Sequence, residues 1–460
     1  EFYREKPMKI IVVGSGNTGR SVISNLVLEG HDITLIDSSE ETVTNMSNSY
    51  DISCFLGSAT DKDALVEAGA ESADFVIATT EKDEMNMLCG VAAKKLGAKH
   101  IIVRVRDPQY TRQTEFLRSA MGIDTIINPD QECAAEIARI LKFPSASRVD
   151  KFSRGNVEIV EYTVPEGSVL CGLKLMELSG RFKTRVLITL AERGEKVFVP
   201  KGSFMPEAGD KLSLAGTQND IKHFFKTVNA YVRPVRKVML VGGGRLATYL
   251  AMALADTDMS VTVVEKDHAI AENFADRVGH AEVVFGDATD SEVLSEAGID
   301  EVDAIASVTG DNAVNITISM FAKARGVRTI ITKLSRDEYS GIVESLGMGT
   351  FVNPNEIISN QITRLVRATG SGRGGNVKTM YRLADGGAEA LEFIVEEDSL
   401  CINTPLKSLK LIPNLLVAAV IRKGKNITPG GDTEILPGDR VVVVTTEKGL
   451  QDVNGIVSKA

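Results

Sequence analysis

The sequence predicts an α/β protein with two doubly wound parallel-sheet domains, each followed by a small α+β domain. Apolar strands alternate with helices of about ten residues, which is the pattern of a parallel sheet. The same order occurs twice along the 460 residues, and each copy opens with a glycine-rich loop. A chain of this length is too long for one hydrophobic core, so several domains are expected.

The two glycine-rich loops lie in matching places. Residues 14–19 read Gly-Ser-Gly-Asn-Thr-Gly after the apolar run KIIVV, and residues 242–247 read Gly-Gly-Gly-Arg-Leu-Ala after KVMLV. An acid, Asp37 or Glu265, follows each loop at the same distance. One such loop is a weak indication, because glycine-rich turns are common. Two in register, each with its acid, indicate a duplicated nucleotide-binding unit.

Six strands are expected in the first copy. Their runs are apolar on both sides, as a sheet covered by helices on both faces requires. The strands are 9–13, 32–37, 52–57, 73–80, 100–105 and 124–129, and helices are expected after Gly19 and over 39–48, 61–69 and 84–96. The second copy repeats this order, with GDATD at 286–290 corresponding to GSATD at 57–61.

A capped helix follows each predicted sheet. The Asn-Pro pairs at 128–129 and 353–354 supply an N-cap and a first helical residue, and both helices carry an aliphatic stripe. Such a stripe fits packing on the helix's own domain as well as crossing onto a neighbouring one. Our hypothesis is that these helices, 129–142 and 354–367, join neighbouring large domains.

Two small modules, at about 157–228 and 377–458, contain short β-like runs, a short helix and a Gly-Asp turn before the last strand. Large and small modules therefore alternate along the chain. The predicted domains are 8–142, 143–228, 236–368 and 377–460.

Composition argues against several classes of partner. The net charge of −10 disfavours nucleic acid and direct attachment to an anionic bilayer. No apolar run is long enough to span a membrane, so direct insertion is not expected. The five cysteines are scattered, which predicts reduced, buried thiols in a cytosolic protein. The five histidines show no metal-ligand spacing, so no metal site is expected.

The loops and their acids suggest which ligand binds. The glycines allow a tight turn and close approach of a pyrophosphate, whose charge faces the amides of the helix N-terminus. Asp37 and Glu265 end the second strands, where a carboxylate accepts hydrogen bonds from a ribose diol and repels a 2′-phosphate. This favours NAD(H) or an adenine nucleotide over NADP(H). NAD, ADP and ATP all carry the diol, so the acid does not choose among them.

Polar residues at other strand ends leave alternatives open. Arg104 and Lys333 lie in apolar fifth strands, and a cation there needs an anionic partner, either a ligand phosphate or a buried carboxylate. Arg245, inside the second loop, fits an additional terminal phosphate and equally fits a solvated arginine. Asp83 and Glu84 are expected to be surface charges at a helix start.

With these features in place, the chain resembles the TrkA family, the cytosolic regulatory subunits of bacterial Trk potassium uptake systems. The large units resemble Rossmann-like RCK (also called KTN) N-terminal domains, and the small ones resemble RCK C-terminal domains. The resemblance rests on VVGSGNTGRSV, DITLID, GSATD, ADFVIATTEKDEMNM and VRVRDPQY in the first half. In the second half it rests on MLVGGGRLA, VVEKD, VVFGDATD and VTGDNAVN.

The family resemblance implies a cytoplasmic tetramer that forms a ring of RCK domains, held at the inner face of the membrane by a potassium-translocating partner. It implies binding of NAD(H), with ADP and ATP as further candidates. The implied first site is Gly14, Ser15, Gly16, Asn17, Thr18, Asp37, Ser58, Ala59, Thr80 and Arg104. The implied second site is Gly242, Gly243, Gly244, Arg245, Leu246, Glu265, Asp287 and Thr309. Relatives often carry an acid where this chain has Ser58, which puts adenine preference at the first site in doubt.

The sequence leaves two alternatives to regulation, an enzyme and a ligand-binding module. An NAD-dependent oxidoreductase with a duplicated cofactor domain needs a substrate pocket and a proton donor or acceptor beside the nicotinamide. The small modules show no paired His/Asp, Ser/Lys or Cys/His arrangement, so sensing is favoured over catalysis and the chain is not expected to be an enzyme. The third possibility is a ligand-binding module of another transport system.

Overall fold

The computed structural model describes residues 7–142, 148–153, 156–228, 234–335, 347–370, 377–450 and 452–458. The chain divides into two compact units: Glu1–Leu141 with Val235–Thr363, and Lys142–Pro234 with Arg364–Ala460. The first unit holds both parallel sheets, and the second holds both antiparallel sheets. The connections at 143–147, 229–233 and 371–376, where predicted domains adjoin, lie outside the described residues.

The first parallel sheet places the glycine-rich loop at a topological switch point. Among the described residues of the first half, six strands pair in the order β3-β2-β1-β4-β5-β6. Val13, at the end of β1, lies between Ile36 of β2 and Ala78 of β4, so the chain leaves β1 where the strand order reverses. Crevices at such points bind ligands in open α/β sheets. The strands are β1 (Lys9–Val13), β2 (Asp32–Asp37), β3 (Ser53–Leu56), β4 (Phe75–Ala78), β5 (His100–Arg104) and β6 (Thr125–Ile127).

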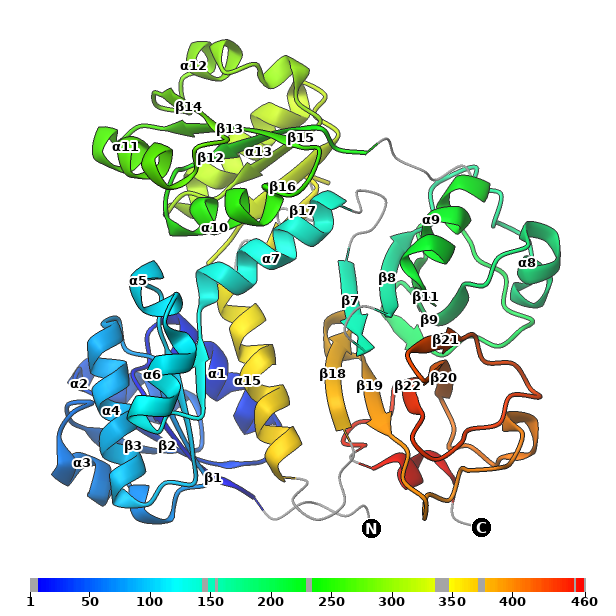
Figure 1. Ribbon diagram of the computed structural model, residues 1–460, viewed down its shortest axis with the longest axis horizontal. Coiled ribbons are helices and arrows are strands. Elements are labelled where there is room, and N and C mark those ends of the chain that lie inside the picture. Colours follow the sequence, from blue (N-terminus) through cyan, green and yellow to red (C-terminus); the bar gives the residue numbers. More distant parts are fainter. Residues whose placement is uncertain are drawn as a thin grey trace. The chain divides into compact units, whose positions relative to one another are not determined.

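Helices surround this sheet (Figure 1). They are α1 (Asn17–Leu28), α2 (Glu40–Ser49), α3 (Lys62–Glu67), α4 (Asp83–Leu96), α5 (Pro108–Thr111) and α6 (Thr114–Met121). The last helix of this half, α7 (Pro129–Lys142), leaves the sheet. Ile11 and Val13 pack with Leu65 of α3 and Ala93 of α4. Their neighbour Val12, on the other face of β1, is fully buried as well. Burial on both faces explains why these strands lack polar alternation.

The second parallel sheet repeats the first. Its described strands pair in the order β14-β13-β12-β15-β16-β17. They are β12 (Lys237–Val241), β13 (Ser260–Glu265), β14 (Glu282–Phe285), β15 (Ala304–Ser307), β16 (Thr329–Lys333) and β17 (Thr350–Val352). The described helices are α10 (Arg245–Leu254), α11 (His268–Arg277), α12 (Ser291–Glu296), α13 (Asn312–Ala324) and α15 (Pro354–Gly370). The predicted duplication of a doubly wound α/β fold is confirmed.

The two capped helices cross between the large domains of the first unit. Ile137 and Leu141 of α7 are fully buried in a cluster with Leu246 and Leu250 of α10. In return, α15 runs beside α1 of the first domain (Figure 1) and is joined to it by hydrogen bonds such as Asn25 Nδ2 to Ser359 Oγ, 2.6 Å. The structure thus decides between the two packings that the sequence left open, and the crossing is made within one chain.

The second unit consists of two antiparallel sheets that share a core. Phe152 and Leu190 of one sheet lie in one buried cluster with Ala390 and Val444 of the other. The described strands pair in the orders β10-β9-β11-β8-β7 and β18-β19-β22-β20-β21. The first set is β7 (Arg148–Phe152), β8 (Val157–Thr163), β9 (Leu187–Arg193), β10 (Lys196–Phe198) and β11 (Lys211–Gly216), with helices α8 (Leu175–Phe182) and α9 (Gln218–Thr227). The second set is β18 (Val377–Leu383), β19 (Ala388–Ile394), β20 (Leu415–Arg422), β21 (Lys425–Ile427) and β22 (Arg440–Thr445).

The cysteines are free, but not all of them are buried. Burial raises the pKa of the Cys133 thiol, inside the crossing of α7, to about 12. Cys171 is exposed and Cys54 is half-buried, so the expectation of uniformly buried thiols is wrong for these two. In the part of the chain that the structure describes, no helix is long and apolar enough to cross a membrane.

The crossing of α7 predicts a stability effect. Replacing Ile137 by Ala leaves a cavity in the core of the second large domain and should lower the free energy of unfolding by about 2–5 kcal/mol. Leu28→Ala, at a side chain that is 78% exposed, is the control and should change it by less than about 0.5 kcal/mol. Urea unfolding followed by circular dichroism measures both. An effect of Ile137→Ala as small as the control's would contradict the crossing.

Candidate functional site

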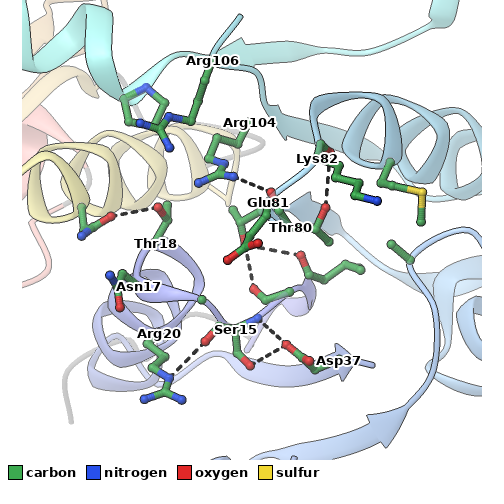
Figure 2. A pocket seen from close by; sticks show the side chains of 18 of the residues that line it. Ser15, Asn17, Thr18, Arg20, Asp37, Thr80, Glu81, Lys82, Arg104 and Arg106 are labelled. Carbon is green, nitrogen blue, oxygen red and sulfur yellow. Dashed lines mark hydrogen bonds between the residues drawn. The ribbon is translucent and has the colours of Figure 1, made fainter. Parts of the chain in front are cut away.

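A pocket of about 1040 Å³ opens around the first glycine-rich loop, at the carboxyl ends of β1, β2, β4 and β5 (Figure 2). Gly14 has a φ of +91°, and a Cβ there would lie 2.8 Å from the Thr80 backbone nitrogen. A Cβ at Gly19 would lie 2.0 Å from the Gly14 carbonyl oxygen. Both positions therefore require glycine, the first for its turn and the second for the close approach of α1 to the loop.

The acid at the end of β2 is fixed against the loop. Asp37 Oδ2 accepts hydrogen bonds from the backbone N and the Oγ of Ser15, at 2.7 and 2.8 Å. Asp37 Oδ1 accepts one from the Ser39 backbone N, 3.0 Å away. In the second domain, Glu265 Oε2 accepts from the Gly243 backbone N at 2.6 Å. Each acid thus orients the loop beside it and stays at the edge of its crevice.

A buried asparagine ties β4 to β5 below the pocket. Asn86 Oδ1 accepts hydrogen bonds from the backbone N of Thr80 at 2.8 Å and from its Oγ1 at 2.7 Å. Its Nδ2 donates to the Thr80 and Arg104 carbonyl oxygens. Asn315 makes the same contacts with Thr309 and Lys333. The sequence placed the two asparagines in correspondence without assigning them this role.

Arg104 is a largely buried cation that faces the pocket. Its Nη2 donates to the Thr80 carbonyl oxygen at 2.5 Å, and its Nε is buried without a hydrogen-bond partner. Among the described residues no carboxylate pairs with it. Burial lowers the pKa of this guanidinium, and the neighbouring charge of Arg106 lowers it further. The sequence allowed two partners for Arg104, a buried carboxylate or a ligand phosphate. Because no carboxylate among the described residues forms an ion pair with it, an anionic ligand is favoured.

All ten residues predicted for the first site line this one pocket. The loop carries the anion-binding amides, Asp37 lies on one side, and Thr80 with Arg104 lies on the other (Figure 2). Ser58 also lines the pocket, and its hydroxyl lies 3.3 Å from Thr60 Oγ1. The pocket can therefore hold an elongated anion, with its phosphates on the loop and a diol at Asp37.

The residues predicted for the second site belong to the second domain and do not line this pocket. Glu265 is buried beside Gly243, and Thr309 ends the strand run opposite the loop. Asp287 is exposed and accepts hydrogen bonds from the backbone N and Oγ1 of Thr289. These bonds lower the pKa of its carboxyl.

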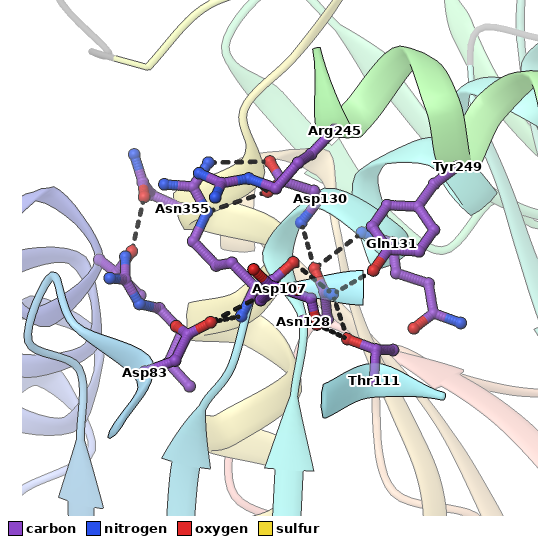
Figure 3. A network of polar contacts seen from close by, with 12 residues as sticks. Asp83, Asp107, Thr111, Asn128, Asp130, Gln131, Arg245, Tyr249 and Asn355 are labelled. Atoms are coloured by element: carbon purple, nitrogen blue, oxygen red, sulfur yellow. Dashed lines mark hydrogen bonds and ion pairs between the residues drawn. The ribbon is translucent and has the colours of Figure 1, made fainter. Parts of the chain in front are cut away.

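Arg245 of the second loop points toward the first domain (Figure 3). Its Nε lies 3.4 Å from Asp130 Oδ2, at the start of α7. Arg106 binds the same carboxylate through Nε at 2.9 Å and Nη2 at 3.1 Å. Nearby, Asn128 Nδ2 donates to the Tyr249 hydroxyl at 3.0 Å. Arg245 stays exposed to solvent, and its guanidinium also takes part in the contact between the two large domains.

Asp83 is a further correction. It is only 9% exposed, and its Oδ2 accepts hydrogen bonds from the backbone N of Arg106 and of Asp107, at 2.9 and 2.8 Å. It fixes the segment after β5 instead of lying on the surface (Figure 3). Glu84 accepts from the Tyr110 hydroxyl at 2.8 Å.

Several lining residues were not predicted. Four of them belong to the second domain: Lys333 at the end of β16 and Ser335 just after it, and Pro354 and Asn355 in the first turn of α15. Lys333 Nζ donates to the Thr309 carbonyl oxygen at 2.9 Å, and burial lowers the pKa of its ammonium. The match of Lys333 to Arg104 in sequence was the available signal. The other unpredicted polar residues on the pocket wall include Arg20, Glu81, Lys82, Arg106 and Asp130.

The chemistry of this wall suits binding. The amides of the loop and the partly desolvated cations can bind phosphate, and the Asp37 carboxylate can accept hydrogen bonds from a diol. In the described ranges, no group of three His, Cys, Asp or Glu side chains is arranged to hold a metal ion.

Comparison with known proteins identifies the relatives of the chain. The TrkA-N domain family matches residues 10–129 and again 238–354, and the TrkA-C domain family matches 159–229 and 390–457. The chain is 31% identical over 437 residues to the Trk system potassium uptake protein TrkA homolog of Archaeoglobus fulgidus, covering 95% of this chain and 97% of that protein. It is 29% identical over 461 residues to the Trk system potassium uptake protein TrkA of Vibrio alginolyticus, covering 98% of each.

Solved structures share the fold. The RCK domain of GsuK covers 96% of this chain and 93% of its own, with a TM-score of 0.62 and 17% identity. The GsuK channel bound to NAD covers 96% of this chain and 77% of its own, with a TM-score of 0.63 and 18% identity. At these identities the likeness shows the fold alone.

The unpaired Arg104 leads to a prediction. Replacing it by Met removes a buried cation together with one hydrogen bond, so the free energy of unfolding without ligand should change by no more than about 1 kcal/mol. Binding of pyrophosphate or NAD should weaken by about tenfold or more, because a charged hydrogen bond to the anion is lost. Scanning fluorimetry and calorimetry measure these effects. Arg325→Met, at an exposed ion pair with Asp300, is the control. Unchanged affinity in Arg104→Met would remove Arg104 from the site.

Proposed function

Because the chain belongs to the TrkA family, we propose that it is a nucleotide-sensing regulatory subunit of a potassium uptake transporter. It binds NAD(H), ADP or ATP in the crevices of its large domains and controls a membrane-embedded partner that translocates potassium. The relatives that match over nearly the whole chain are named as Trk system potassium uptake proteins, which supports this assignment.

The observation that carries the proposal is the pocket around the first loop. Its amides and Arg104 favour phosphate, and Asp37 favours a ribose diol without a 2′-phosphate. An adenosine-bearing dinucleotide or diphosphate carries both features, because its phosphates are attached at the 5′ position of the ribose whose 2′ and 3′ hydroxyls form the diol. The proposed ligand residues of the first site are Gly14, Ser15, Gly16, Asn17, Thr18, Asp37, Ser58, Ala59, Thr80 and Arg104.

The second crevice is proposed as a separate nucleotide site with a different preference. At the position that corresponds to Ser58, the second domain has an exposed acid, Asp287, which favours adenosine at the second site. Arg245 forms an ion pair with Asp130, so a terminal phosphate at this site would compete with Asp130 for the guanidinium. The proposed ligand residues are Gly242, Gly243, Gly244, Arg245, Leu246, Glu265, Asp287 and Thr309.

We propose regulation without turnover. The family match and the two duplicated crevices account for nearly the whole chain, and the TrkA-C matches cover the small modules in which a dehydrogenase would need its substrate site. The proposed assembly is a homotetramer whose RCK domains form a ring, held at the cytoplasmic face of the membrane by the transporter. The proposed domains are 8–142, 143–228, 236–368 and 377–460.

A ligand controls such a partner only by binding one shape of the subunit more tightly than another. The crossing helices provide a physical route for this difference. Asp130, in the first turn of α7, and Asn355, in the first turn of α15, lie on the wall of the first pocket. The later turns of α7 pack on the second large domain, and those of α15 pack on the first. A ligand that changes the pocket therefore acts on the contact between the domains.

The role of Asp37 predicts a loss of affinity. Asp37→Ala removes the acceptor for the ribose diol and should weaken binding of NAD at the first site by about tenfold or more. Titration calorimetry with NAD, NADH, ADP and ATP measures the change, and thermal unfolding checks that the fold survives. Asp32→Ala, at an exposed position on the same strand, is the matched control, and Glu265→Ala reports the second site. An unchanged dissociation constant in Asp37→Ala would remove this residue from the site.

Regulation and catalysis predict different behaviour of the purified chain. A regulatory subunit should co-purify with a membrane potassium transporter when the two are expressed together. The complex should form without any added substrate. The chain alone should not oxidise NADH when small oxidised metabolites are supplied, as followed by absorbance of the nicotinamide. Sustained, substrate-dependent NADH consumption would favour the oxidoreductase alternative instead.

A further inference from the structure

The two crossings between the large domains have different chemistry, although they come from one duplication. The α7 crossing places Ala134 and Ala138 in the apolar cluster of the second domain. In α15, counted from its Asn-Pro start, the corresponding residues are Ser359 and Thr363, and both are buried. At these two positions the α7 crossing carries methyl groups, and the α15 crossing carries hydroxyl groups.

The first two turns of α15 are hydrogen-bonded to α1. Asn25 Nδ2 donates to Ser359 Oγ at 2.6 Å and to Asn360 Oδ1 at 3.3 Å. Ser359 Oγ donates to the Ser21 carbonyl oxygen at 2.8 Å. We refer to these contacts, together with those of Asn355, as the α1–α15 seam. Its partners can exchange one hydrogen bond for another at little net cost, whereas separating packed apolar side chains leaves voids.

Asn355 is the member of the seam that reaches the pocket. Its Oδ1 accepts a hydrogen bond from Thr18 Oγ1 at 2.9 Å, and its Nδ2 donates to the Ser335 carbonyl oxygen at 3.2 Å. Its backbone oxygen accepts from Ser21 Oγ at 3.4 Å. Figure 3 shows Asn355 beside the polar network around Asp130, and Figure 2 shows Thr18 on the loop side of the same contact.

Thr18 has a single hydroxyl proton, so its Oγ1 cannot donate to Asn355 and to a ligand at the same time. It is also one of the first residues of α1, where the amides attract an anion. A phosphate bound there accepts the hydrogen bond from the Thr18 hydroxyl, and its charge repels the Asn355 side-chain oxygen. The corresponding loop residue of the second domain is Leu246, which has no proton to exchange.

We propose that Asn355 is the ligand-responsive contact of the first site. A nucleotide phosphate on the loop takes the Thr18 hydroxyl from Asn355, weakens the α1–α15 seam and lets α15 shift against α1. The α7 crossing keeps its place in the apolar core of the second domain. This inference rests on the proposed function, because it assumes that a nucleotide occupies the first pocket.

Hydrogen exchange followed by mass spectrometry tests the shift on the wild-type chain. Saturation with NAD or ADP, at concentrations set by calorimetry, should speed amide exchange in residues 354–363 at least twofold and leave residues 129–141 unchanged. Binding without any change at 354–363, or with equal changes in both helices, would overturn the inference and leave the proposed function standing. A wild-type chain that binds neither nucleotide would overturn the proposed function itself.

Variants of Asn355 test the exchange of the hydrogen bond directly. Asn355→Ala removes the competitor for Thr18 and should tighten binding at the first site about fivefold, the equivalent of one hydrogen bond. Asn355→Asp keeps the acceptor but adds a negative charge beside the phosphate, so it should weaken binding about tenfold. Asp32→Ala, at an exposed position outside both the seam and the pocket wall, should stay within about twofold.

Calorimetry measures these dissociation constants. Where two binding events are seen, the one that Asp37→Ala weakens is assigned to the first site. Thermal unfolding is measured for every variant. Unchanged or weaker binding in a folded Asn355→Ala protein, or tighter binding in Asn355→Asp, would overturn the role of Asn355. If either variant fails to fold, the other variant and the exchange measurement on the wild type still decide.

Discussion

The exchange of helices α7 and α15 between the two large domains is the constraint on which the rest of the first unit depends. An aliphatic stripe on a helix must be buried, and a stripe that lies beyond the last strand of its own sheet needs another surface. The stripe of α7 is completed by α10, so the core of the second domain contains part of the first. Neither large domain is therefore a closed unit, and a change at their contact affects both.

This exchange also builds the candidate site. The Asn-Pro caps that start α7 and α15 bring their first turns to the open end of the first sheet, where Asp130 and Asn355 join the pocket wall. The loop, Asp37 and Arg104 come from the first domain, while Lys333 and Ser335 come from the second. A ligand that fills the pocket therefore contacts both domains, which is the arrangement that a sensor of metabolic state requires for coupling.

The duplication has left two sites with one framework and different details. Asn86 and Asn315 keep the same hydrogen bonds to neighbouring strands, because each satisfies buried backbone groups that any version of the fold must satisfy. Ser58 and Asp287 differ at exposed edges, where each side chain hydrogen-bonds to the threonine two residues later, Thr60 or Thr289. A shared backbone framework with different side chains at its exposed edges is what we expect if the two crevices respond to different nucleotides.

The sequence by itself determined the features that depend on neighbours along the chain. These include the alternation of strands and helices, the glycine turns, the acid after β2 and the Asn-Pro caps, because backbone sterics and hydrogen bonding within a few residues dictate them. Only the tertiary structure decided where the aliphatic stripes pack, that Asp83 is buried, and that Arg104 has no carboxylate partner among the described residues. It alone brought Asn355 to Thr18, because contacts between residues hundreds of positions apart depend on how whole surfaces fit together, and no local pattern encodes that fit.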